Sequence, residues 1–485
     1  MTNTVPDVLG QRAAADPDRE ALAVHGIGAL TCREWEERSN ALAHGLLARG
    51  IQAGDRVGLV FGQADWLRFA VSWCAVLKAG AVAVPLSDRT APAERDRLLT
   101  RCSAVAALHG PDAEPPSTVG WSATPEEIQA TTSSPPGIEL RPGDLAQILF
   151  TSGTTGTPKG VAATHANLAF GSAVHPKRRP FAHSKHLLHA FPIGTNAAQV
   201  MVQHALTAAP TVLTLPLFTP ARFARLIENR GVGTVFVVPA MAIELLNAGV
   251  AKEFDLSSVL LLGSAAAALP PSVAAELSAA FPRAAITNYY TSTEASPAQT
   301  IMLYDPDRPG SLGRAAGGSQ LKIADADGEP VPAGQTGEVW LRAGTHARTY
   351  YGEEGASDVF RDGWVRMGDL GYLDDEGYLY LVDRERDVIK SGAFKVSTLQ
   401  VEAALHEHPE IVEAAAFGVP HAVLGSVVAA AVVSRSPLAL PDVRAFLAGR
   451  LADHELPTRL LPLETLPRND AGKVLKTELR RLVQE

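Results

Sequence analysis

One run of ten residues, 151–160, has the composition of a phosphate-binding loop. It reads Thr-Ser-Gly-Thr-Thr-Gly-Thr-Pro-Lys-Gly and follows the apolar segment 145–150, which we expect to form a buried strand. Glycine allows positive φ angles and close backbone approach, so main-chain N–H groups, hydroxyls and a lysine can surround an anion. A flexible surface turn is the alternative. The candidate phosphate-binding residues are Thr151, Ser152, Gly153, Thr154, Thr155, Gly156 and Lys159.

The loop is expected to lie between a strand and a helix, because Thr164 can cap a helix that begins near Ala166. Pro158 occupies the place where a Walker loop needs its second glycine, so this is a different kind of phosphate loop. Nucleotide chemistry is therefore the leading hypothesis.

Residues 290–294 put an aromatic ring, hydroxyls and a carboxylate on one short loop after an apolar segment. They read Tyr-Thr-Ser-Thr-Glu. Upstream, the small residues of the run 263–270 could let a flat base lie close to the backbone. An ordinary turn with a solvated glutamate and an alanine-rich helix start are the respective alternatives.

Three segments of the C-terminal part carry charged residues. Residues 364–369 end in Met-Gly-Asp, residues 382–396 contain a cluster of charges, and residues 466–473 read Leu-Pro-Arg-Asn-Asp-Ala-Gly-Lys. Taken singly, an aspartate after glycine is usually a turn residue, and a charge cluster or a lysine near the C-terminus is usually solvated. The significance of these segments depends on their order along the chain.

In their order from residue 151 to residue 473, these motifs resemble those of the adenylate-forming superfamily of acyl-CoA synthetases, adenylation domains and luciferases. The resemblance extends over nearly the whole chain. It implies that Tyr290 lies against adenine, that Thr293 bonds near the α-phosphate and that Glu294 helps to hold Mg²⁺. The candidate nucleotide-binding residues in and next to the segments 263–270 and 290–294 are Gly263, Ser264, Ala265, Tyr289, Tyr290 and Thr291.

The resemblance also implies roles for the C-terminal segments. Asp369 and Arg384 would reach the ribose, and Arg386 would be the pivot between two domain arrangements. Lys473 would bridge the attacking carboxylate and the α-phosphate, and Lys390 would belong to the face that serves the thioester step.

Two departures from the superfamily pattern bear on the reaction. Thr291 adds a β-branched side chain where the pattern has a glycine, and Ala393 adds a methyl group beside the implied pantetheine channel. They put the size of the substrate or the type of reaction in doubt.

The implied reaction attaches a carboxylic acid to AMP at the expense of ATP and then transfers the acyl group to a thiol, most naturally that of coenzyme A. The candidate acid-pocket residues are Thr195, Asn196, Val238 and Ala265. Residues 191–200 contain no aspartate to pair with an α-ammonium group, so an amino acid is disfavoured and an aryl or medium-length aliphatic acid is favoured. The alternatives are loading of a carrier-protein phosphopantetheine in trans, use of another nucleophile, and an inactive nucleotide-binding regulator.

Thr31 and Glu34 are expected to form a capping box at the start of a helix. The apolar segments 211–215, 234–238 and 259–262 are expected to form buried strands, whereas the segment 111–137, rich in proline, serine and threonine, is expected to be irregular.

Helix and strand patterns alternate along the chain and predict an α/β fold with doubly wound sheets, followed by a β-rich part from about residue 311. A length of 485 residues predicts more than one domain. We expect a large domain over residues 1–383, which binds ATP and acid, and a small mobile α/β domain over residues 384–485, which carries Lys473.

Composition excludes several other classes. The net charge is -9 without long charge runs, so no nucleic-acid partner is expected. Cys32, Cys74 and Cys102 have no metal-site or disulfide spacing, which favours a reducing compartment. The start of the chain lacks a signal-like pattern and the longest apolar run is shorter than a membrane span, so a cytoplasmic enzyme without a membrane segment is expected.

Overall fold

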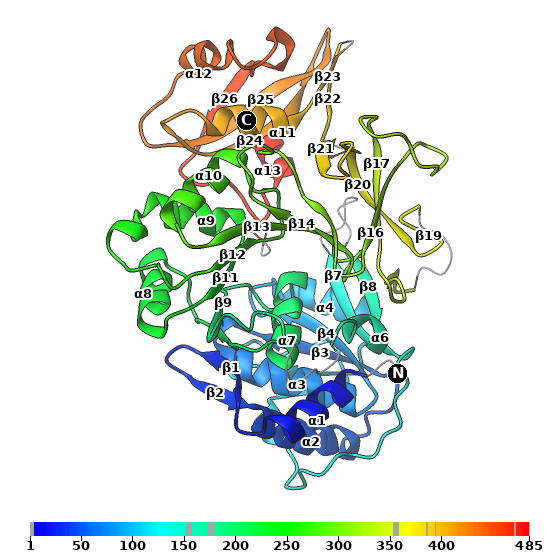
Figure 1. The fold of residues 1–485 in the computed structure, drawn as a ribbon. Helices are drawn as coiled ribbons and strands as arrows, with labels where there is room; N and C mark the ends of the chain where they lie inside the picture. Colours follow the sequence, from blue (N-terminus) through cyan, green and yellow to red (C-terminus); the bar gives the residue numbers. More distant parts are fainter. Residues whose placement is uncertain are drawn as a thin grey trace.

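The computed structural model describes residues 4–151, 158–172, 179–352, 358–384, 387–392, 394–469 and 472–484. Within these residues the chain forms four β-sheets with helices packed around them (Figure 1). The predicted α/β fold class is confirmed. Three apolar clusters supply most of the core, one around the N-terminal helices, one around the middle of the largest sheet and one in the C-terminal part.

The largest sheet has nine strands, of which the six from β13 to β1 run parallel. Its predicted strands near 211–215, 234–238 and 259–262 are present, each displaced by up to two residues. In sheet order the strands are β15 (Arg314–Ala316), β14 (Gln299–Leu303), β13 (Ala285–Tyr290), β12 (Leu261–Ser264), β11 (Thr234–Val237), β9 (His186–Leu188), β10 (Thr211–Thr214), β1 (Glu20–Val24) and β2 (Gly28–Thr31).

The second sheet has seven strands and contains the predicted strand before the phosphate loop. In sheet order they are β18 (Thr349–Tyr350), β8 (Lys159–Thr164), β7 (Leu145–Thr151), β4 (Val82–Ser87), β3 (Arg56–Phe61), β5 (Ala106–His109) and β6 (Trp121–Ala123).

The expected strand–loop–helix order around residues 151–160 is wrong. The segment after the loop first forms β8, which pairs antiparallel with β7 and places Val161 opposite Leu149. The four middle residues of β8, 160–163, are glycine, valine and alanine, and all are buried, so this strand extends the sheet beyond β7. Thr164 does cap a helix, since its hydroxyl accepts a bond from Asn167 N at 3.2 Å, but that helix, α6, has only four residues.

The third and fourth sheets are formed by the later part of the chain. The third consists of β16 (Gln320–Ala324), β17 (Gly337–Arg342), β20 (Trp364–Leu373), β19 (Phe360–Arg361) and β21 (Leu379–Arg384), and matches the predicted β-rich part. The fourth consists of β23 (Phe394–Val396), β22 (Ile389–Ser391), β25 (Gly425–Ser434), β24 (Ile411–His421) and β26 (Arg459–Pro462).

Several helices begin at a threonine whose side chain caps the first turn. Thr31 and Glu34 form the capping box that the sequence predicted for α2. The segment 111–137 was expected to be irregular but includes β6 and α5. The α-helices are α1 (Val5–Ala15), α2 (Cys32–Ala48), α3 (Trp66–Lys78), α4 (Pro92–Arg101), α5 (Pro125–Ile128), α6 (His165–Leu168), α7 (Asn196–Thr207), α8 (Pro220–Arg230), α9 (Pro239–Asn247), α10 (Pro271–Ala280), α11 (Thr398–His406), α12 (Leu440–Leu447) and α13 (Lys476–Gln484).

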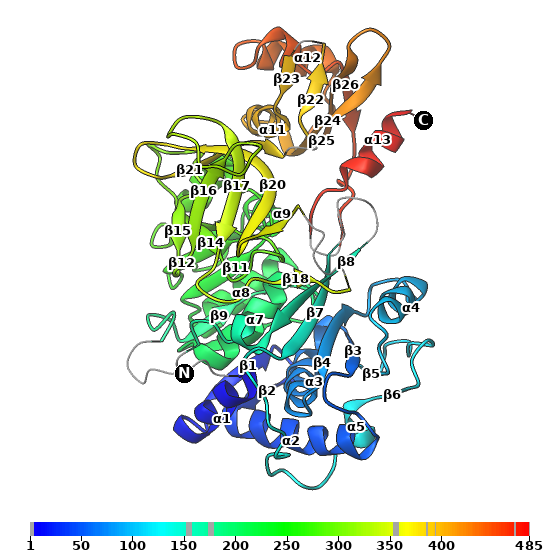
Figure 2. The ribbon, with the colours of Figure 1, turned by 90° about the vertical axis from the view of Figure 1, so that its right-hand side faces the viewer.

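The fourth sheet and its helices lie at one end of the molecule, above the nine-stranded sheet in the views of Figures 1 and 2. Val412 of β24 packs against the apolar cluster that includes α8, α9 and α10. Arg435 Nη2 donates to Asn247 Oδ1 at 2.9 Å across the same boundary. The C-terminal elements are therefore docked on the larger part in one defined arrangement.

Candidate functional site

The candidate site lies where three neighbouring parallel strands, β11, β12 and β13, end. Val238 follows β11, Ser264 is the last residue of β12 and Tyr290 is the last residue of β13. The carboxyl ends of parallel strands are the usual location of ligand sites in α/β sheets. Residues predicted from separate motifs therefore meet at one edge of the sheet.

Two buried polar atoms at this edge have no protein partner within the described part of the chain. They are Ser264 Oγ and Asn288 Oδ1, whose residues are paired across β12 and β13. A buried polar atom without a partner is costly unless a ligand or water satisfies it. A nucleotide base, which carries both donors and acceptors, fits this part of the site. Asn288 was not predicted as a site residue. Its position two residues before Tyr290, on the strand that ends at the site, is the signal that could have identified it.

The alanine-rich segment after β12 has a strained backbone. Ala266 has a φ of +74°, in the left-handed region that residues other than glycine rarely adopt. Ala265 N, one residue earlier, donates to Val237 O at 3.1 Å and so holds the segment against β11. Strain of this kind clusters at functional sites.

The residues predicted for the ribose are brought together by β20 and β21. Asp369 and Arg384 are paired across these strands, and Arg384 Nε lies 3.6 Å from Asp369 Oδ1. The Tyr290 hydroxyl donates to Asp369 Oδ2 at 2.5 Å. Burial and the neighbouring carboxylate raise the pKa of Tyr290 well above its usual value, so the phenol keeps its proton. Asp369 is thus a buried carboxylate held from two sides.

Glu294 and Lys159 meet at Tyr350, a residue that the sequence did not single out. The Tyr350 hydroxyl donates to Glu294 Oε1 at 3.2 Å, and Lys159 Nζ lies 4.4 Å from the centre of the Tyr350 ring. Within the described residues no cluster of three histidine, cysteine or acidic side chains could hold a metal by itself. One carboxylate next to a phosphate site nevertheless fits Mg²⁺, which is usually bound through one or two carboxylates together with substrate phosphates.

Thr293 and Asn196 are linked by Arg348, which was also not predicted. Arg348 Nη1 donates to Thr293 O at 2.9 Å and to Asn196 Oδ1 at 3.0 Å. Burial lowers the pKa of Arg348 to about 10, and the nearby Glu294 carboxylate opposes that shift. The guanidinium remains charged at neutral pH and ties the loop after β13 to the start of α7.

Thr291, the first departure from the superfamily pattern, has a local structural role. Its hydroxyl donates to Ala298 O at 2.6 Å, across the turn that joins β13 to β14. The extra polar atom is therefore satisfied within the turn.

The side of the site assigned to the acid is lined by neutral residues. The Thr195 hydroxyl caps α7 by accepting from Ala198 N at 3.1 Å and donates to Pro192 O at 2.9 Å. Phe236 contacts the Tyr289 ring, with 5.4 Å between ring centres, and the Phe181 ring, with 5.7 Å. Burial lowers the pKa of the adjacent His204 to about 4, so this histidine is uncharged at neutral pH.

Of the two predicted lysines of the C-terminal part, the segment of Lys473 reaches the site. A Cβ built on Gly472 would lie 3.4 Å from Val238 Cγ2, which is ordinary contact, so the turn before Lys473 packs against the end of β11. Lys473 N donates to Asn469 Oδ1 at 2.9 Å within this turn. Lys390, in contrast, is exposed on β22 of the fourth sheet and makes no contact with the site residues described above.

Several predicted residues lie outside the described part of the chain. They are Ser152, Gly153, Thr154, Thr155, Gly156 and the predicted pivot Arg386, together with Ala393. Thr151 and Lys159, which border the phosphate loop, are described, and the Thr151 hydroxyl is 3.5 Å from Lys159 O. The predicted loop is therefore framed by the ends of β7 and β8.

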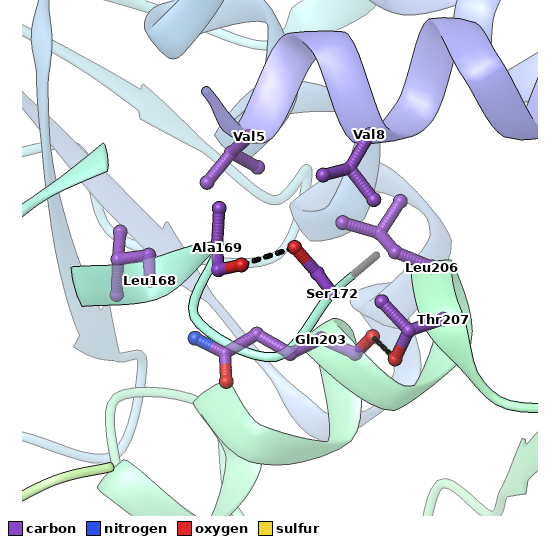
Figure 3. Close-up of a pocket in the computed structure, with 8 residues that line it drawn as sticks. All are labelled: Val5, Val8, Leu168, Ala169, Ser172, Gln203, Leu206 and Thr207. Carbon is purple, nitrogen blue, oxygen red and sulfur yellow. Dashed lines mark hydrogen bonds between the residues drawn. The ribbon is translucent and has the colours of Figure 1, made fainter. Parts of the chain in front are cut away.

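A small cavity elsewhere in the fold is distinct from this site. Figure 3 shows it between α1, α6 and α7, with Ser172 and Gln203 among its otherwise mainly apolar walls. Its volume of about 10 Å³ leaves space for roughly one water molecule. It cannot accommodate an organic acid.

Comparison with known proteins agrees with this geometry. Residues 9–351 match the model of the AMP-binding enzyme family, and residues 400–473 match that of the AMP-binding enzyme C-terminal domain. The chain is 32% identical to a feruloyl-CoA synthase from an Amycolatopsis species, over 97% of each chain.

Two solved structures share the fold over nearly the full length. ATP-bound MatB from Rhodopseudomonas palustris is 27% identical, with a TM-score of 0.86 over 99% of both chains. The O-succinylbenzoate coenzyme A synthetase from Bacillus subtilis, in complex with ATP and magnesium ion, is 25% identical, with a TM-score of 0.83 over 98% of this chain and 99% of the other.

The fold and these relatives define an AMP-forming acid–thiol ligase. The chain belongs to the AMP-binding enzyme family. The predicted activity, in which ATP activates a carboxylic acid that is then transferred to a thiol, is confirmed at this level, as are ATP, Mg²⁺ and coenzyme A as the compounds it uses. Within the described residues, no helix combines the length and apolar character needed to cross a membrane.

Proposed function

We propose that this enzyme joins a compact, uncharged aryl acid to coenzyme A. A carboxylate is a poor electrophile, so its oxygen first attacks the α-phosphorus of ATP and expels pyrophosphate, which yields the acyl-adenylate. The coenzyme A thiol then attacks the acyl carbon, loses its proton and expels AMP. Neither step needs a protein nucleophile, because positioning and charge stabilisation supply the catalysis.

In this proposal Lys473 acts in the first step. Its ammonium group bridges the attacking carboxylate and the α-phosphate and offsets the charge that develops there. The single observation that carries the proposal is the packing of Gly472 against Val238, because it brings the lysine's turn to the strand ends where acid and nucleotide would meet. This packing supports the proposal that the C-terminal part is docked in the arrangement that serves adenylation.

The remaining nucleotide contacts follow from the site. Asp369 accepts from the ribose hydroxyls with Arg384 beside it, Tyr290 lies against the base and Thr293 bonds near the α-phosphate. Glu294 would hold Mg²⁺, which neutralises phosphate charge when bound. The support for these roles is that the side chains converge on the ends of β12 and β13. The buried Asp369 carboxylate and the half-buried Glu294 carboxylate are both hydrogen-bonded there, and two buried polar atoms beside them have no partner among the described residues.

The second step is proposed to use a different arrangement of two domains, residues 1–383 and 384–485, with Arg386 as the pivot. Lys390 stands on an exposed strand of the C-terminal sheet, away from the nucleotide side, and would reach the site only after such a movement. Phe394 lies on the same hairpin and is also exposed. This hairpin would line the path of the pantetheine arm.

The class of acid is inferred from the aromatic cluster formed by Phe181, His204, Phe236 and Tyr289. These rings stand directly behind Gly263, where a Cβ would already be 2.6 Å from Phe236 Cε1. Flat, neutral walls favour an aromatic ring. The 32% identity to a feruloyl-CoA synthase supports the same class.

The test is a panel of acids measured by pyrophosphate release and then by acceptor dependence. Ferulate, 4-coumarate, benzoate, octanoate and palmitate should be offered with ATP and Mg²⁺, and each adenylate then with coenzyme A or a phosphopantetheinylated carrier protein. We expect the aryl acids to give the highest kcat/KM and coenzyme A to be the acceptor. A preference for palmitate would refute an aryl acid as the substrate. Transfer only to the carrier protein would refute coenzyme A as the acceptor.

A cytoplasmic location is part of this proposal. The three cysteines, Cys32, Cys74 and Cys102, are all buried free thiols, which suits a reducing compartment. Localisation of a tagged chain in its native host would test this directly, and recovery from an oxidising compartment would contradict it.

A further inference from the structure

The segment 345–350, which follows β17 and ends with β18, connects three parts of the candidate site. Its last two residues form β18, which pairs with β8 so that Tyr350 lies opposite Val161 on the strand that begins at Lys159. Its earlier residues pass beside α6 and α7. No motif recognised in the sequence covers this segment, yet two of its side chains contact the region of Glu294.

Arg348 is the first of these side chains and is almost completely buried, with 2% of its surface exposed. Nε donates to Asn167 Oδ1 at 2.9 Å, while Nη1 donates to both Asn196 Oδ1 and Thr293 O. Thr293 O belongs to the residue before Glu294. A buried charged donor that holds this carbonyl restricts the backbone from which the Glu294 side chain extends.

Asn167 extends the same network to the other side of the loop. Its Nδ2 donates to Ser296 O at 3.1 Å and to His346 O at 3.0 Å. The loop that contains Glu294 is therefore bonded at Thr293 and again at Ser296, on both sides of the glutamate. Fully satisfied buried networks of this kind make a local structure rigid.

Tyr350 is the second side chain and contacts the carboxylate itself. Its hydroxyl donates to Glu294 Oε1, and its ring lies beside the Lys159 ammonium group. The phenol thus fixes the direction of the carboxylate, and the ring joins it to the strand that leaves the phosphate loop. The contact between lysine and ring is of the cation–π type.

We propose that Arg348 and Tyr350 are positioning residues that fix the Glu294 carboxylate for Mg²⁺, Arg348 through Thr293 O and Tyr350 through its hydroxyl. This inference rests on the proposed function in one respect, that Glu294 is the residue that holds the metal. Neither residue touches the reacting atoms. Their effect is that the metal ligand is already oriented when MgATP arrives.

A role in packing alone would not require these groups. Methionine is similar in length to arginine and could fill much of the same space, but it would leave Thr293 O and Asn196 Oδ1 without their donor. Phenylalanine fills the space of Tyr350 and retains the ring beside Lys159, but it cannot bond to Glu294. Arg348→Met and Tyr350→Phe therefore separate hydrogen bonding from packing.

The experiment is equilibrium binding of ATP by calorimetry without any acid, so that no turnover occurs, in excess Mg²⁺ and in EDTA. The quantity of interest is the factor by which Mg²⁺ strengthens ATP binding. We expect this factor to fall by about tenfold in Arg348→Met and by about threefold in Tyr350→Phe, with binding in EDTA nearly unchanged. Glu294→Gln should lose most of the factor, and adding Arg348→Met to it should cause no further loss.

Arg12→Met is the matched control, because Arg12 is also fully buried and donates to a backbone carbonyl, Ala208 O, but lies in α1. It should leave the Mg²⁺ factor unchanged. Equal losses in Mg²⁺ and in EDTA for Arg348→Met would make the arginine merely structural and overturn the proposal.

Two further outcomes are distinguishable. An unchanged factor in Arg348→Met and Tyr350→Phe, with a reduced one in Glu294→Gln, would also overturn the positioning proposal. An unchanged factor in Glu294→Gln would instead refute the metal role on which it rests. If Arg348→Met does not fold, Tyr350→Phe, which removes a single oxygen, decides the question alone.

Discussion

Replacement of Gly263 by alanine tests whether Phe236 and Tyr289 close the acid pocket. A Cβ built on Gly263 lies 2.6 Å from Phe236 Cε1, 2.8 Å from Phe236 Cδ1 and 2.9 Å from Tyr289 Cε2. Since carbon atoms prefer separations of about 3.5 to 4.0 Å, the methyl group overlaps both rings by roughly 1 Å. Phe236 cannot retreat freely, because the Phe181 and His204 rings stand next to it.

The overlap can be relieved in two ways, and each has a measurable cost. If the rings stay in place, overpacking should lower the free energy of unfolding by about 1 to 3 kcal/mol. If they shift into the pocket, the KM for ferulate should rise, by about tenfold for every 1.4 kcal/mol of lost binding. We therefore expect Gly263→Ala to lose stability, acid affinity or both.

The assay combines urea unfolding with pyrophosphate release at varied ferulate concentration. Gly449→Ala is the matched control, because a Cβ built there meets no heavy atom within 4 Å. The double variant Gly263→Ala/Phe236→Leu should recover much of the loss, since the smaller side chain makes room for the methyl group. If Gly263→Ala has both the stability and the KM for ferulate of the wild type, Phe236 and Tyr289 do not close the acid pocket.

Two further predictions follow from buried ionisable groups. Burial lowers the pKa of His165 to about 4 and that of His189 to about 3, so between pH 6.5 and these values the unfolded chain binds protons that the folded chain does not. The free energy of unfolding should therefore fall on acidification, by about 2 kcal/mol for each histidine at pH 5, and urea titrations that give equal stability at pH 7 and pH 5 would contradict this. Asp369→Asn should weaken ATP binding by about tenfold or more, because a carboxylate is a stronger acceptor for hydroxyls than an amide. Calorimetry with ATP checks this, and unchanged affinity would remove Asp369 from the ribose site.

The sequence predicted those parts of the fold and site that have a local signal. Capping residues such as Thr31 and Glu34 locate a helix, and apolar segments locate the parallel strands. Tyr290, Asp369 and Arg384 could be grouped because each belongs to a motif, and the structure brings all three side chains together. The assignment of roles within that group stays a prediction.

The features that the sequence did not predict depend on contacts between distant segments. A lone arginine at position 348 has no pattern, and its role becomes visible only where Asn167, Asn196 and Thr293 surround it. Residues 159–164 were expected to lead into a helix because Thr164 carries a real capping signal. The strand forms because β7 offers it an unpaired edge, which is a tertiary effect.

The central claim is that Lys473 serves the first half-reaction and not the second. The most direct measurement compares Lys473→Ala with the wild type and with Lys252→Ala, an exposed lysine shortly after α9, in two separate assays. Pyrophosphate release with ferulate reports adenylate formation, and coenzyme A consumption with synthetic feruloyl-adenylate reports thiolysis. We predict that Lys473→Ala loses adenylate formation by about 10²-fold to 10³-fold and keeps thiolysis within about threefold. Equal loss of both half-reactions, or retention of adenylate formation, would contradict the account.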